Sequence, residues 1–124
     1  MKHLGIRAAF ALVPFTIAAV GLIPVAAAGM DSHAAAPTIQ VKGGEFFFRL
    51  STKSAAKPGK LTFVFKNIGH VLHDFKINGK KTPLIAPGKT AKLVVSFTKK
   101  GKYPYLCTVP GHAQAGMKGT FTVR

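Results

Sequence analysis

The feature that most constrains the fold is a repeated alternation of side chains in short segments between turn residues. In Leu61–Lys66 it places Leu61, Phe63 and Phe65 on one face, and 90–97 repeats the pattern with Leu93, Val95 and Phe97. Successive side chains of a strand point to opposite faces, so this period indicates strands with one buried face. Residues 38–124 contain no comparable helical periodicity. They predict one all-β domain, an antiparallel β-sandwich of seven to eight strands.

The turn residues divide this region into individual strands. Pro58-Gly59, Asn67-Ile68-Gly69 and Asn78-Gly79 are turn signals. Gly43-Gly44 is expected to break or bulge the first strand. We expect strands at residues 38–42, 45–50, 61–66, 72–77, 90–97, 103–107 and 117–123.

The N-terminal segment resembles an export signal. Lys2 and Arg7 precede an almost wholly apolar stretch at 8–25, and Ala26-Ala27-Ala28 fits a small-residue cleavage site. The apolar stretch is longer than the usual signal core, so an uncleaved membrane anchor is the alternative. We expect residues 1–28 to be a signal peptide and 29–37 a flexible lead-in. The mature protein is then periplasmic, extracellular or attached to the cell envelope.

The stretch from Tyr103 to Met117 carries the chemistry. It holds Cys107, which is the sole cysteine, His112 five residues later and Met117 five residues after that. Without a second cysteine no intramolecular disulfide forms, which leaves metal ligation or an intermolecular link. Each of the three residues alone would be unremarkable, as a core methionine, a buried thiol or an exposed histidine. Together they favour copper, because structural zinc sites do not normally recruit methionine.

A trigonal copper site of this kind needs a second histidine. His73 is the candidate, because it begins an expected strand just after the Asn67 turn. His70 is the alternative and lies inside that turn. A ligand at the end of a strand is held by a rigid scaffold, which favours His73.

Two segments resemble the cupredoxins, the blue copper proteins. They are Asn67 to His73-Asp74-Phe75, and G-K-Y-P-Y-L-C-T-V-P-G-H-A-Q-A-G-M. The resemblance covers residues 38–124 and implies a Greek-key β-sandwich with one type 1 copper ion per chain. It also implies His73, Cys107 and His112 as equatorial ligands, with Met117 as the axial ligand.

The resemblance does not assign a subfamily. The C-x-x-P-G-H beginning is similar to azurin, whereas the G-M ending is similar to plastocyanin and the plant basic blue proteins. The plant proteins have a disulfide that this chain cannot form. Asp74 also stands where several cupredoxins carry asparagine.

Neighbouring residues are expected to tune the copper site. Hydrogen bonds to a thiolate ligand shift the reduction potential of the metal that it binds. The backbone N–H groups of Asp74 and Val109 are the candidate donors, whereas Pro110 has no N–H to donate. Asn67 begins the turn before His73. Pro110-Gly111 forms a tight turn from which His112 projects, and in the cupredoxins this histidine carries the electron to the partner.

The sequence thus predicts an exported one-electron carrier and not an enzyme. A copper-binding or copper-delivery protein without a redox duty is the alternative. A nitrite reductase or multicopper oxidase would need a second copper centre, for which the predicted mature chain leaves only His33 and His70. The formal net charge of +15 favours redox partner proteins with an acidic docking surface. Export argues against nucleic acid. We expect a monomer, with membrane association only through an uncleaved N-terminal segment.

Overall fold

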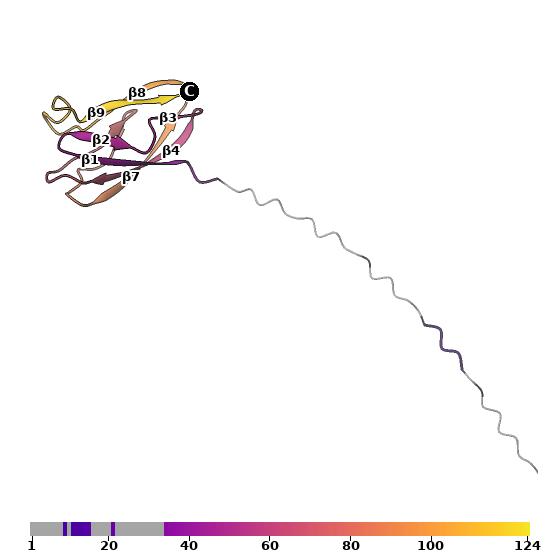
Figure 1. Ribbon diagram of the computed structural model, residues 1–124. Helices are drawn as coiled ribbons and strands as arrows, with labels where there is room; N and C mark the ends of the chain where they lie inside the picture. The colour runs from indigo at the N-terminus through magenta and orange to yellow at the C-terminus, as the bar shows by residue number, and fades with distance from the viewer. Residues whose placement is uncertain (1–8, 10, 16–20, 22–33) are drawn as a thin grey trace, which may run out of the picture. The chain divides into compact units, whose positions relative to one another are not determined.

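The computed structural model describes residues 9, 11–15, 21 and 34–124 (Figure 1). The expected cleavage site at Ala26–Ala28 and most of the expected lead-in lie outside these residues. None of the described residues belongs to a helix long and apolar enough to cross a bilayer.

Nine strands form the domain between residues 34 and 124 (Figure 1). They are β1 (Thr38–Gly44), β2 (Phe47–Leu50), β3 (Ser54–Ala55), β4 (Gly59–Asn67), β5 (Lys76–Ile77), β6 (Lys80–Lys81), β7 (Thr90–Phe97), β8 (Gly101–Leu106) and β9 (Lys118–Val123). β3, β5 and β6 contain two residues each. Strands this short carry too little alternation to be recognised in a sequence, so β3 and β6 were not predicted.

The strands form two sheets that enclose one core. One sheet has the order β2-β1-β4-β7 and the other β3-β9-β8-β5-β6. Both sheets contribute buried apolar side chains, including Phe63 and Phe65 of β4 and Phe121 of β9, all of them 0 % exposed. The predicted all-β sandwich is confirmed. Most pairings are antiparallel, but β1 pairs with β4 and β3 with β9 in parallel.

The predicted end of the first strand at residue 42 and the predicted start of the second at residue 45 were wrong. Gly43 and Gly44 do not break a strand, because they end β1 and pair with Phe48 and Phe47 of β2. The chain turns instead at Glu45–Phe46. Gly43 is required by packing: an added Cβ would lie 2.7 Å from a ring carbon of Phe65. Glycine therefore marks close packing here and not a bend in the chain.

The predicted strand at 72–77 is mostly irregular. Only Lys76–Ile77 forms a strand (β5), and His73 makes an isolated antiparallel bridge to Ile85. The His73 N–H donates to Ile85 O at 3.2 Å, and the Ile85 N–H donates to His73 O at 2.8 Å. These two bonds fix the backbone of His73 without a continuous strand.

Candidate metal centre

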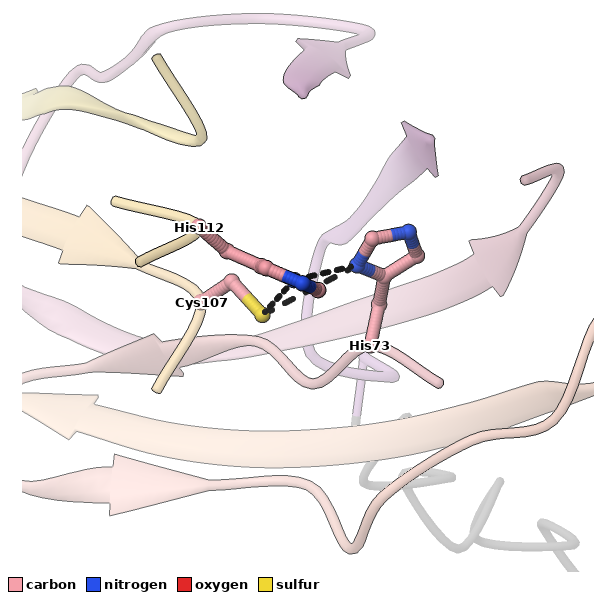
Figure 2. A group of neighbouring side chains, drawn as sticks. All are labelled: His73, Cys107 and His112. Carbon is pink, nitrogen blue, oxygen red and sulfur yellow. Dashed lines mark hydrogen bonds between the residues drawn. The ribbon is translucent and has the colours of Figure 1, made fainter. Parts of the chain in front are cut away.

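Three side chains with metal-binding atoms meet at one end of the sandwich. The Nδ1 atoms of His73 and His112 are 3.1 Å apart, and Cys107 Sγ lies 3.9 Å from His73 Nδ1 and 3.7 Å from His112 Nδ1. Figure 2 shows the three side chains pointing toward one another. His73 and Cys107 are buried, and His112 is half-buried. Among the described residues this is the one group of three or more such side chains close enough to share an ion.

The structure separates the two candidate histidines of the Asn67 turn. His73 is 0 % exposed and belongs to the group. The His70 side chain is 95 % exposed, and its Nδ1 lies 3.3 Å from Glu45 Oε2. Of the two, only His73 faces Cys107.

The loop after β8 positions Cys107 and His112 through a tight turn. The His112 N–H donates to Val109 O at 3.1 Å, and Gly111 adopts a φ of 84°. Pro110 at the second position and a positive φ at the third are the signature of a type II turn. The turn returns the chain to Cys107, so that His112 lies beside its sulfur.

Met117 closes the same loop. Its N–H donates to His112 O at 3.0 Å, and its carbonyl accepts the Cys107 N–H at 3.1 Å. The side chain is 0 % exposed, and its methyl carbon would lie 3.0 Å from a Cβ added at Gly43. The backbone of Met117 is therefore hydrogen-bonded to both His112 and Cys107, and its side chain packs against β1.

Asn67 and Asp74 brace the segment that carries His73. Asn67 is fully buried, and its amide donates to Val71 O at 2.8 Å and to Ile85 O at 2.7 Å. The Asp74 carboxylate, also fully buried, accepts the N–H of Thr108 at 2.6 Å and bonds the Thr108 hydroxyl. Lys81 Nζ lies 3.8 Å from Asp74 Oδ2. These bonds tie the segment around His73 to the loop that begins at Cys107.

A third segment, the turn at Glu45–Phe46, was missed by the sequence analysis. Glu45 Oε1 lies 2.8 Å from His73 Nε2. The ring of Phe46 meets that of His112 edge to face, with centroids 4.9 Å apart. The available signal was composition, since Glu45 is one of only three acidic residues in the chain.

Burial and hydrogen bonding set the ionisation of two groups at the site. Burial raises the pKa of the Cys107 thiol, and the backbone N–H groups of Asp74 and Val109 act in the opposite direction. The pKa of Glu45 is lowered to about 2, mainly by His73 and the His70 N–H. Glu45 is thus ionised at neutral pH. The thiolate is the form of cysteine that binds a metal, so a bound cation would replace the proton of this thiol.

The donor set fits a small thiophilic ion. Two imidazole nitrogens and one sulfur lie within 4.8 Å of one another, and metal–nitrogen and metal–sulfur bonds are about 2.0 and 2.3 Å long. Two histidines and a cysteine, with a methionine on the same loop, are the ligand types of blue-copper sites.

Comparisons with known proteins agree with this chemistry. The family model for copper-binding proteins of the plastocyanin/azurin family matches residues 25–124. The copper-resistant cuproprotein CopI of Pseudomonas aeruginosa is 26% identical over 140 aligned positions, which cover 73% of this chain and 77% of that protein.

Solved structures share the fold. Reduced auracyanin from Roseiflexus castenholzii superimposes with a TM-score of 0.62 at 22% identity, over 73% of this chain and 98% of that one. A multi-copper oxidase from Pediococcus acidilactici gives 0.61 at 17% identity, over 73% of this chain but 27% of the oxidase. The predicted cupredoxin family and copper as its metal are confirmed. The chain belongs to the plastocyanin/azurin family of copper-binding proteins.

Proposed function

We propose that this protein is an exported one-electron carrier that uses His73, Cys107, His112 and Met117 as the ligands of one type 1 copper ion. The observation that carries the proposal is the convergence of buried His73, buried Cys107 and half-buried His112, with Met117 hydrogen-bonded into the same loop. When bound, copper supplies a one-electron couple between Cu(II) and Cu(I), and a trigonal His₂Cys site with a weak thioether accommodates both.

The protein's own contribution is to hold these side chains in one arrangement. The backbone bonds of His73 to Ile85, of Cys107 to Met117 and of Met117 to His112 restrain three segments at once. Burial also excludes water from the cysteine sulfur. A site that changes little between its two charge states transfers electrons with little reorganisation.

His112 is the proposed exit for the electron. It is the half-buried member of the group, whereas Cys107 and His73 are enclosed. Phe46, which packs against it, is 41 % exposed, and Val71 and Leu72 just before His73 are 46 % and 47 % exposed. Exposed apolar side chains thus lie beside the site, where a redox partner could approach closely.

The proposed partner carries an acidic surface. Lys42 on β1 is paired with Arg49 on β2 and with Lys66 on β4, so three exposed cations lie side by side across the sheet. Like charges placed directly opposite each other destabilise a sheet. An acidic partner would relieve this repulsion, and its association would be steered by the field of the basic surface.

Spectroscopy of the copper-loaded protein tests the function. We expect intense visible absorption from the thiolate–copper bond and a narrow copper hyperfine splitting, both lost in Cys107→Ser. A colourless copper complex, or colour that persists in Cys107→Ser, would contradict the proposal.

Salt dependence tests the partner. The second-order rate of electron transfer to an acidic redox protein should fall steeply with added salt. Lys42→Gln should flatten that dependence more than Lys102→Gln, an exposed change on the other sheet. Equal effects of the two substitutions would mean that the net charge, and not the row of Lys42, Arg49 and Lys66, governs the encounter.

A second function is a copper-binding or delivery role in copper resistance. It is favoured by the similarity to the copper-resistant cuproprotein of Pseudomonas aeruginosa. Transfer of bound copper to a chelating acceptor distinguishes the two roles. A carrier retains its copper while it is repeatedly reduced and reoxidised, whereas a delivery protein loses copper to the acceptor in its Cu(I) form. We do not propose an enzyme. A nitrite reductase or multicopper oxidase would need a second copper centre, and among the described residues only His73, Cys107 and His112 form a group of three that could hold a metal ion.

Export is proposed from the N-terminal sequence. Mass spectrometry of the protein from a periplasmic or extracellular fraction should find a chain that begins after Ala28. A membrane-bound chain that retains residues 1–28 would support the uncleaved anchor.

A further inference from the structure

We propose that Glu45 is a positioning residue for His73, which directs Nδ1 of that histidine toward copper by accepting the proton on Nε2. The proposal rests on the copper site proposed above. It concerns a residue from a different strand connection, 28 positions away in the sequence.

The contacts of Glu45 form a small built site. Its Oε1 accepts the backbone N–H of His70 at 2.8 Å and of Val71 at 3.2 Å, and lies 2.8 Å from His73 Nε2. The carboxylate side chain is 27 % exposed, whereas His73 is completely enclosed. Two backbone donors therefore hold the carboxylate in place beside the imidazole.

The tautomer of His73 follows from the partner. A carboxylate accepts hydrogen bonds and donates none, so the Nε2 that faces Glu45 carries the proton. In a neutral imidazole the other nitrogen then has a free lone pair. That nitrogen, Nδ1, is the one that faces Cys107 and His112. A carboxylate on the far nitrogen of a ligating histidine also makes the imidazole a stronger base.

Gly69 leaves the space that Glu45 occupies. A Cβ added at Gly69 would collide with the Glu45 carboxylate, lying 2.8 Å from its Cδ and closer still to Oε1. The backbone of Gly69 is in turn held by its N–H bond to Asn67 Oδ1 at 2.9 Å. Gly69→Ala should therefore displace the carboxylate while leaving Glu45 itself unchanged.

Three variants separate positioning from a general structural role. Glu45→Gln keeps the size and one acceptor oxygen but removes the charge. Gly69→Ala keeps the charge but moves it. His70→Ala is the matched control, because it removes the exposed imidazole next to Glu45 and leaves the contact to His73 in place.

The first measurement is made on the metal-free wild-type protein. Nitrogen NMR of the imidazoles should show His73 with its proton on Nε2. A proton on Nδ1 of His73 would overturn the proposal, whatever the copper site does.

The second measurement is copper affinity and reduction potential. Loss of the carboxylate contact should weaken Cu(II) binding by about 10- to 100-fold, the usual cost of removing such a partner. It should also raise the potential, because a nearby negative charge favours Cu(II). We expect both changes in Glu45→Gln and Gly69→Ala, and neither in His70→Ala. If the wild type is blue and the variants keep its copper affinity and potential, the role of Glu45 is refuted but the proposed function is not. A wild type without the blue spectrum would instead refute the proposed function.

Discussion

Asp74 Oδ1 accepts the backbone N–H of Thr108 at 2.6 Å, so the residue after His73 is bonded to the residue after Cys107. The same carboxylate bonds the Thr108 hydroxyl, and it is completely buried. This one side chain therefore joins the two segments that carry the proposed metal ligands.

Asp74→Ala should lower the free energy of unfolding by about 2–4 kcal/mol, because it deletes two bonds to a charged acceptor and leaves the Thr108 N–H without its partner. Asp74→Asn is the control, since its amide oxygen can still accept that N–H. Urea unfolding of the metal-free variants measures both. Equal losses for alanine and asparagine would show that the charge, and not the hydrogen bonding, stabilises the fold.

Gly43→Ala should disturb the packing around Met117. The added Cβ would lie 2.7 Å from Phe65 and 3.0 Å from the methyl carbon of Met117. We expect a loss of about 1–3 kcal/mol from overpacking, together with a shifted visible spectrum of the copper-loaded protein. Gly44→Ala is the control. It changes the next residue of β1, where the added Cβ would meet mainly the half-buried Phe47 ring. An unshifted spectrum in Gly43→Ala would mean that the position of the Met117 side chain does not affect the copper site.

Asn67→Ala should destabilise the turn before His73. The amide donates to the carbonyls of Val71 and Ile85 and accepts the Gly69 N–H, so its loss removes three hydrogen bonds from the turn. We expect a decrease of about 2 kcal/mol or more in the free energy of unfolding, measured by thermal or urea unfolding. Wild-type stability in this variant would show that water replaces the amide.

The stability of the metal-free protein should fall in acid through Glu45. Its pKa is about 2 in the folded protein, compared with an ordinary value of 4.5. Because the folded pKa is the lower one, the contribution is complete above about 4.5 and is lost as the pH falls toward about 2. Urea unfolding at stepped pH should show a smaller decline in Glu45→Gln. The same decline in both proteins would assign the acid sensitivity to other groups.

Removal of copper should lower the melting temperature, because an ion that binds only the folded state stabilises it by mass action, by about 2.7 kcal/mol at a hundredfold excess over Kd. Cys107→Ser should abolish the difference between the loaded and metal-free forms. Met117→Leu should retain most of it with a changed spectrum, since an axial thioether binds weakly. A complete loss in Met117→Leu would make the methionine a principal ligand.

Much of this protein could be predicted from local sequence. Alternation in 61–66 and 90–97 depends only on neighbouring residues, and it correctly identified β4, β7 and the sandwich. The Gly43-Gly44 pair was misread because glycine signals both bends and close packing. Only the neighbouring Phe65 and Met117 side chains, brought together from β4 and the C-terminal loop, reveal the second meaning.

The sequence by itself determined the chemistry of the copper site, because Cys107, His112 and Met117 lie on one short loop whose Pro110-Gly111 turn sets their spacing. The sequence also favoured His73 over His70, and the tertiary structure shows that His73 faces that loop, whereas the His70 side chain is exposed. Tertiary structure alone decided that Glu45 reaches His73 and that Phe46 packs against His112. Contacts of this kind depend on strand order and register, which place the Glu45–Phe46 turn beside residues far away in the chain.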